Sequence, residues 1–144
     1  MKTQIRENEI LSPLELRTII PEYIGFSQKA LNYYFEKKYW GPIPDADLIS
    51  ETTGSCGDTM MVYLKIREDV IVDARFAVRG CIGTVVAAMA AGDLIIGKTL
   101  LQARSITDGD IFRELEEIPA KKHHCIQLAA KTLHQALDTY QAKL

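Results

Sequence analysis

The stretch that decides the fold runs from Asp58 to Arg79 and reads DTMMVYLKIREDVIVDARFAVR. It contains two runs in which an apolar residue stands at every second position, separated by Glu68-Asp69. Such alternation is typical of strands with one buried face, and the short separation predicts a tight turn between them. The segment therefore predicts an antiparallel hairpin. The side chains expected on its inner face are Met60, Val62, Leu64 and Ile66 in the first strand, and Val70, Val72, Ala74, Phe76 and Val78 in the second.

Helical patterns precede this hairpin. Ser12-Pro13-Leu14-Glu15 has the form of a helix N-cap, and Pro21 is the expected stop of that helix. Ser27 opens a second helix, which we expect to end near Trp40. A third strand is expected in the residues just before Cys56.

Helical patterns also follow the hairpin. The apolar spacing predicts a helix between residues 81 and 97, a short helix after Thr99 and another from Asp108. A long last helix is expected to bury a stripe of residues between 125 and 140. The order of elements predicts an α+β fold, in which helices pack on one face of a small antiparallel three-stranded sheet.

The composition is that of one globular domain. The chain has 144 residues, of which 47% are hydrophobic and 25% charged, with a net charge of −2. This charge gives no reason to expect a nucleic-acid partner. The longest apolar stretch, residues 81–96, contains Asp93 and is shorter than the roughly 20 residues that span a bilayer, so no membrane partner is expected. With no apolar signal segment near the start, we expect a cytoplasmic protein.

Three cysteines stand near the ends of predicted elements. Cys56 and Asp58 lie two residues apart at the start of a strand, so that both can face one ion. Cys81 lies at a strand-to-helix junction, and Cys125 follows His123-His124 at the start of the last helix. Element ends can converge at one edge of a sheet. No C-x-x-C occurs, which excludes a zinc-finger spacing. From the residues alone, a shared metal site and three separate buried thiols both stay open.

Short segments in a fixed order carry a resemblance to a known family. The chain resembles the iron–sulfur cluster scaffolds of the IscU and NifU N-terminal type. The resemblance implies a SufE/NifU-like fold over residues 26–144 and leaves residues 1–25 as an N-terminal extension with a short helix. The matching segments are Phe26-Ser27-Gln28-Lys29-Ala30-Leu31 with Tyr34, Cys56-Gly57-Asp58, Asp73-Ala74-Arg75-Phe76, Gly80-Cys81, Gly97-Lys98-Thr99-Leu100 with Ala103, and His124-Cys125.

The resemblance also implies a site and a function. Cys56, Cys81 and Cys125 are expected to be thiolate ligands or sulfur acceptors, Asp58 the family's aspartate, and His124 an alternative ligand. Such a site is expected to hold a labile [2Fe–2S] cluster. A cysteine desulfurase would deliver its sulfur, and acceptor apo-proteins would receive the cluster, so the chain is expected to be a scaffold and not an enzyme. Whether it forms a homo-oligomer stays open.

Two of the departures from the family pattern lie next to the expected site residues. No serine occurs in residues 82–89, where the family has a serine-rich run. Ile118-Pro119-Ala120-Lys121-Lys122 stands where the family has a Leu-Pro-Pro-Val-Lys stretch that binds a chaperone. We therefore do not expect handover through the usual Hsp70-type chaperone.

Three other functions compete with the cluster scaffold. The first is a zinc-binding sulfur acceptor of the same fold, because Zn²⁺ accepts the same sulfur and oxygen ligands. The second is a thiol enzyme with Cys56 or Cys125 as nucleophile, His124 as base and Asp58 as its orienting group. The enzyme hypothesis leaves Cys81 without a role and offers no oxyanion donors. The third, a structural interaction module, would make the ordered segments accidental.

Overall fold

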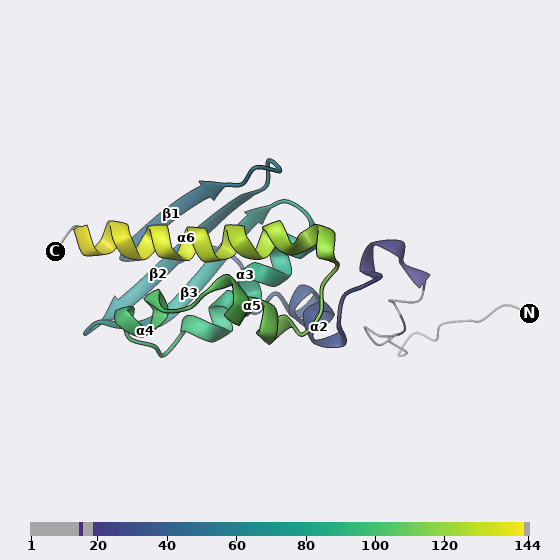
Figure 1. The fold of residues 1–144 in the computed structure, drawn as a ribbon. Coiled ribbons are helices and arrows are strands. Elements are labelled where there is room, and N and C mark those ends of the chain that lie inside the picture. The colour runs from purple at the N-terminus through teal and green to yellow at the C-terminus, as the bar shows by residue number, and fades with distance from the viewer. Residues whose placement is uncertain (1–14, 16–18, 143–144) are drawn as a thin grey trace, which may run out of the picture.

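The computed structural model describes residue 15 and residues 19–142 (Figure 1). Three strands form one antiparallel sheet in the order β1-β2-β3. Strand β1 is Leu48–Thr53, β2 is Thr59–Arg67 and β3 is Val70–Arg79. The predicted hairpin and the predicted third strand are confirmed. The helix expected after Ser12 falls mostly on residues outside the described part of the chain.

A β-bulge changes the inner face of β3. Ile66 pairs with Ile71 while its neighbour Lys65 pairs with Asp73, so that Val72 is the extra residue. Ile71 is consequently fully buried, and Val72 is 43% exposed. The prediction that Val70 and Val72 face inward with Ala74 and Phe76 is therefore wrong at the start of β3, because a simple alternation cannot reveal an inserted residue. The inner face predicted for β2 is confirmed.

The turn between β2 and β3 has a defined type. Glu68 has φ 53° and Asp69 has φ 64°. Positive φ at both central residues is the mark of a type I′ turn, whose twist matches that of a two-residue hairpin. Gly or Asn normally occupies positions with left-handed φ. This turn has Glu and Asp there instead, so its type could not be predicted from the sequence.

Two 3₁₀ turns and five α-helices complete the described fold. Helix α2 ends at Glu36 and not near Trp40, because Lys37 adopts a left-handed conformation with φ 45°. The helices predicted after the hairpin are confirmed. The elements are η1 (Pro21–Tyr23), α2 (Gln28–Glu36), α3 (Ile82–Ile95), α4 (Leu100–Arg104), α5 (Asp108–Leu115), η2 (Ala120–Lys122) and α6 (His123–Ala142).

Helices cover one face of the sheet. Figure 1 shows α6 lying across the strands, with α3 beside it. Helix α3 is buried almost all round, from Gly83 to Gly92, because it lies between the sheet and the other helices. Helix α6 buries the expected stripe, which begins with Cys125 and continues through Leu128, Leu133 and Leu137. No helix among the described residues has the length and apolar character needed to cross a membrane.

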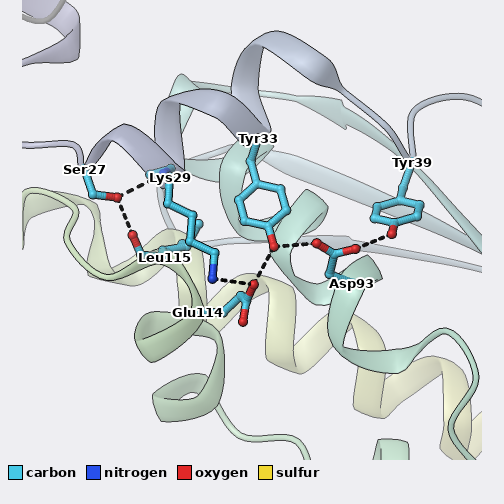
Figure 2. Close-up of polar contacts among 8 residues, drawn as sticks. Ser27, Lys29, Tyr33, Tyr39, Asp93, Glu114 and Leu115 are labelled. Carbon is cyan, nitrogen blue, oxygen red and sulfur yellow. Dashed lines mark hydrogen bonds and ion pairs between the residues drawn. The ribbon is translucent and has the colours of Figure 1, made fainter. Parts of the chain in front are cut away.

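A polar cluster fixes the C-terminal half of α3 to its neighbours (Figure 2). The Tyr33 hydroxyl of α2 lies 2.5 Å from Asp93 Oδ2 of α3 and 2.6 Å from Glu114 Oε2 of α5. Lys29 Nζ lies 2.9 Å from the same Glu114 oxygen, and the Tyr39 hydroxyl donates to Asp93. These contacts hold α2, α3 and α5 together at one end, while the N-terminal end of α3 carries Cys81.

Candidate metal site

The pairing of β2 with β3 places Asp58 against Gly80. Thr59 pairs with Arg79, so the residue before β2 and the residue after β3 are neighbours across the ladder. A Cβ atom on Gly80 would lie 2.5 Å from Asp58 Cγ, closer than any two such atoms approach. Glycine therefore leaves the room that the Asp58 carboxylate occupies. This register brings Asp58 to the start of α3.

Cys81 is the N-cap residue of α3, directly after Gly80. The first turn of α6 packs closely on the first turn of α3. A Cβ on Gly83 would lie only 3.0 Å from Cys125 Sγ, so there is no room for a side chain at that position. The Sγ atoms of Cys81 and Cys125 are 3.6 Å apart, which is a thiol contact and not a disulfide. Cys125 is fully buried, and Cys81 is partly exposed.

Thr84 orients the Asp58 carboxylate. Its hydroxyl donates a hydrogen bond of 2.5 Å to Asp58 Oδ2, which also accepts one of 3.3 Å from the Cys81 backbone N–H. Thr84 is fully buried, so water cannot replace this contact. Burial raises the pKa of Asp58, but hydrogen bonds from Thr84, from the Cys81 backbone and from the Cys81 and Cys56 side chains hold that pKa below its ordinary value.

The two neighbouring thiols influence each other's protonation. The hydrogen bond between their side chains lowers the pKa of Cys81 and raises the pKa of Cys125, because a thiolate at Cys81 accepts a hydrogen bond from the Cys125 thiol, which keeps its proton. The positive charge of Lys122 and hydrogen bonds from Thr84 also lower the pKa of Cys81. The pair thus favours the charged form at Cys81, the more exposed of the two sulfurs, over Cys125.

Three side chains meet in a group that can hold a metal ion. One ligand atom each from Asp58, Cys81 and Cys125 lies within 4.8 Å of the other two. A tetrahedral ion with ligand bonds of about 2.0–2.3 Å has its ligand atoms roughly 3.3–3.8 Å apart, so a small contraction would give this geometry. Two sulfurs and one oxygen suit iron or zinc better than magnesium or calcium.

The other two predicted site residues lie at the edge of this group. Cys56 is exposed in the loop between β1 and β2 and is not one of the three converging side chains. Its thiol is the smallest of the influences that lower the pKa of Asp58. His124 Nε2 lies 3.5 Å from Cys125 Sγ. The structure therefore brings together three of the predicted residues and keeps Cys56 and His124 beside them.

The same geometry argues against a thiol enzyme in which Cys125 is the nucleophile. His124 contacts Cys125, but that cysteine has no exposed surface to offer a substrate. The Asp58 carboxylate accepts hydrogen bonds from Thr84 and Cys81, and not from His124, so it does not orient an imidazole base.

Sequence reasoning missed Thr84, Gly80 and Gly83 as parts of the site. The residues after Cys81 predict only an apolar helix. The signal that could have identified Thr84 is its position: it is a polar residue one turn after Cys81 in a helix that is otherwise apolar through Ala91.

Comparison with known proteins agrees with this arrangement. The family described as NifU-like N terminal domain matches residues 25–144. The iron-sulfur cluster assembly scaffold protein IscU of Aquifex aeolicus is 31% identical over 121 residues, covering 82% of this chain and 77% of its own length. The protein of that name from Escherichia coli K12 is 30% identical over 128 residues, covering 83% and 97%.

Solved structures share the fold. A proposed iron-sulfur cluster assembly scaffold protein for the SUF system, from Fervidobacterium islandicum AW-1, superposes with a TM-score of 0.65 at 26% identity, over 78% of this chain and 96% of its own. The N-terminal part of a NifU-like protein from Brucella abortus gives a TM-score of 0.66 over 82% and 95%; at 19% identity it bears on the fold alone. On these matches, the chain belongs to the family of NifU-like N-terminal domains.

Proposed function

We propose that this chain is a scaffold on which a labile [2Fe–2S] cluster is assembled and from which it passes to acceptor apo-proteins. In this proposal, a cysteine desulfurase supplies the sulfur. The observation that carries it is the convergence of Asp58, Cys81 and Cys125 within 4.8 Å, in a chain that is similar to IscU scaffold proteins.

The chemistry of this ligand set suits temporary binding. Thiolates are good ligands for iron and for iron–sulfur clusters, whereas a carboxylate oxygen is a harder and poorer partner for such a cluster. One oxygen among sulfur ligands should therefore weaken the hold on the cluster and ease its release. A scaffold needs this property, because it must give up its product.

The fourth ligand is proposed to be Cys56. Its loop is exposed, and its thiol is among the groups that lower the pKa of Asp58, so a small movement of the loop would add a third sulfur. Gly57 gives the loop freedom for this movement: its φ is 91°, and no atom lies within 4 Å of where a Cβ would stand. His124 is the reserve ligand because it contacts Cys125.

Zinc binding is the second candidate function. The same three side chains form a tetrahedral donor set for Zn²⁺ when a fourth ligand joins them. In this case the chain would accept sulfur without building a cluster. The metal content of anaerobically purified protein separates the two candidates.

Anaerobic reconstitution tests the scaffold proposal. The protein is incubated with iron, cysteine and a cysteine desulfurase, while visible absorbance and acid-labile sulfide are followed. We expect both signals to rise in wild-type protein, to be lost in Cys81→Ala, and to be kept in Thr139→Ala, an exposed residue of α6 far along the chain from the site. Wild-type protein that gains neither signal, yet holds stoichiometric zinc, would contradict the cluster scaffold and favour the zinc function.

A further inference from the structure

A strained backbone turn stands directly before the segment that leads into α6. Glu116, the C-cap of α5, has φ 71° and ψ −57°. Across it, the backbone N–H of Glu117 donates a hydrogen bond of 2.8 Å to the Leu115 carbonyl. These features define a γ-turn with positive φ, which is rare and strained for a residue other than glycine. A turn of this kind persists only where neighbouring contacts hold it in place.

Ser27 holds the residues on both sides of the turn. Its hydroxyl donates a hydrogen bond of 2.5 Å to the Leu115 carbonyl (Figure 2), and its backbone N–H donates one of 2.8 Å to the Glu117 carbonyl. Ser27 is also the N-cap of α2, where its side-chain oxygen accepts a hydrogen bond from the Ala30 N–H. Because Ser27 is buried, water has little access to these bonds.

The same stretch of chain contacts the segment once more. Gly25 packs on Pro119, since a Cβ at Gly25 would lie only 2.9 Å from Pro119 Cγ. Ile118, between the strained turn and Pro119, is buried in the core. Residues 25–27 therefore clamp residues 115–119 along their length.

This clamp positions the first turn of α6, which follows Pro119 directly through η2. Lys122 and Cys125 both pack against Gly83 of α3: a Cβ there would lie 3.2 Å from Lys122 Cβ and 3.0 Å from Cys125 Sγ. Cys125 is fully buried. A reagent or an ion can therefore reach the Cys125 thiol only when the first turns of α6 and α3 separate.

We propose that Ser27 and the strained turn at Glu116 form a latch, which keeps the first turn of α6 against α3 and releases it when the Ser27 contacts break. The inference rests on the proposed function, because a cluster that Cys125 helps to hold requires access to that thiol. The strain opposes the hydrogen bonds of Ser27 and is comparable with the net contribution of about one or two such bonds. The latch is therefore closed by a small margin and opens without unfolding of the whole chain. Displacement of residues 25–27 would remove the contacts with residues 115–119 and open it.

Alkylation of Cys125 in metal-free, full-length protein measures this opening. The protein is treated with iodoacetamide under native conditions, and mass spectrometry of its peptides follows each cysteine separately. Ser27→Ala should speed the labelling of Cys125 severalfold. Thr99→Ala is the matched control and should leave the rate unchanged, because it removes the N-cap of α4 in the same way but lies outside the latch.

Glu116→Gly should have the opposite effect. Glycine adopts positive φ without strain, so the closed latch gains stability and the labelling of Cys125 should slow severalfold. Lys37→Gly is the control for this substitution. Lys37 also has positive φ, 45°, but it ends α2 and lies outside the latch, so its replacement should leave the labelling rate unchanged.

Gly25→Ala tests the contact with Pro119. The new Cβ would displace the proline ring and should speed the labelling of Cys125. Gly41→Ala is the control, because Gly41 has a similar φ (104° against 91°) but nothing lies within 4 Å of its Cβ position. It carries the same kind of backbone strain without the contact and should leave the rate unchanged. Circular dichroism confirms that each variant is folded.

The outcomes are distinct. Faster labelling in Ser27→Ala together with slower labelling in Glu116→Gly supports the latch. If Ser27→Ala does not fold, Glu116→Gly and its control decide. Unchanged labelling in Ser27→Ala, a rate in Glu116→Gly at or above that of the wild type, or equal rates in Gly25→Ala and Gly41→Ala would overturn it. Equal slowing by Lys37→Gly would overturn it as well, because the exposure of Cys125 would then follow global unfolding.

The latch and the proposed function fail separately, because labelling is measured without metal. If the latch is overturned and a cluster still forms in anaerobic reconstitution, the scaffold stands. If the labelling rates follow the latch and no cluster forms, the scaffold fails and the latch stands.

Discussion

The buried hydroxyl of Thr84 donates a hydrogen bond of 2.5 Å to Asp58 Oδ2, and so joins helix α3 to the start of strand β2. The same hydroxyl lies 3.6 Å from Cys81 Sγ. One threonine thus contacts two of the three side chains that converge at the candidate metal site. It acts on the site through these two neighbours, as a positioning residue.

Thr84→Val should weaken metal binding and make it more sensitive to acid. The variant keeps the shape of the side chain and removes a hydrogen bond that lowers the pKa of Asp58. Because that pKa is held below its ordinary value, the carboxylate is ionised at neutral pH, and its contribution to binding is lost as the pH falls. Without the hydroxyl this loss should begin at a higher pH. We expect zinc affinity near pH 6 to fall by about tenfold, the effect of roughly 1.4 kcal/mol from a hydrogen bond to a charged group.

Competition with a chromophoric chelator between pH 5 and pH 7.5 would measure this change. Thr84→Ser is the matched control, since it keeps the hydroxyl, and it should retain affinity near that of the wild type. If Val and Ser variants bind zinc equally well at every pH, Thr84 has only a packing role.

Asp58→Ala should slow the loss of a reconstituted cluster to an acceptor protein. The substitution removes a hard oxygen ligand and leaves a vacant position that a thiol or the His124 imidazole can fill. The imidazole is close enough, because His124 Nε2 lies 3.5 Å from Cys125 Sγ. Transfer to an apo-ferredoxin under anaerobic conditions, followed by circular dichroism in the visible range, measures the rate. Release that is unchanged or faster would show that the carboxylate does not set the lability of the cluster.

The hydrophobic pattern was enough to predict the fold class, the hairpin and the positions of the cysteines at element ends. It failed where a single residue breaks the period. The extra Val72 in β3 and the left-handed Lys37 that ends α2 are local backbone choices, and neither leaves a mark in the spacing of apolar residues. The convergence of Asp58, Cys81 and Cys125 followed from elements that end at one edge, but the contacts of Thr84 required the packing of α3.

Gly83→Ala should destabilise the protein and disturb the thiol pair. The new Cβ would lie 3.0 Å from Cys125 Sγ and 3.2 Å from Lys122 Cβ, so the first turn of α6 would have to move. Overpacking of this kind costs about 1–3 kcal/mol, more than the 0.5–1 kcal/mol that alanine contributes to a helix. Urea denaturation would measure the difference.

Gly109→Ala is the matched control for that substitution, because a Cβ there meets nothing closer than 3.6 Å. It lies in the first turn of α5 and should leave stability unchanged or slightly higher. Equal stabilities for the two variants would mean that the turns of α3 and α6 are less tightly packed than this geometry requires.

The tyrosine–carboxylate cluster predicts a loss of stability in alkali. Burial and the hydrogen bond to Asp93 raise the pKa of Tyr39 to about 12, and burial followed by hydrogen bonds to Asp93 and Glu114 raises the pKa of Tyr33 as well. A raised pKa in the folded state means that the contribution to stability is complete below the unfolded value of about 10 and is lost as the pH rises above it. The free energy of unfolding should therefore fall between about pH 10 and pH 12.

Tyr39→Phe tests this assignment. It should lower stability at pH 8, because Asp93 loses a hydrogen bond, and should make the decline above pH 10 shallower. Tyr63→Phe, on the outer face of β2, serves as the control and should follow the wild-type curve. A decline of the same steepness in wild type and Tyr39→Phe would locate the alkaline transition elsewhere in the protein.

Gly80→Ala offers a test of whether Asp58 binds metal from the position it holds here. A Cβ at residue 80 would lie 2.5 Å from Asp58 Cγ and 2.6 Å from its Oδ2, so the carboxylate would be displaced from Thr84 and from the ligand group. Gly80→Ala in the wild-type background should lower zinc affinity about as much as Asp58→Ala does. In the Asp58→Ala background the same change should have little effect, because the side chain that it displaces is gone. Coupling of this kind is expected for residues in direct contact. Additive losses in the double variant would instead mean that alanine at residue 80 acts on Cys81, through the backbone that the two residues share.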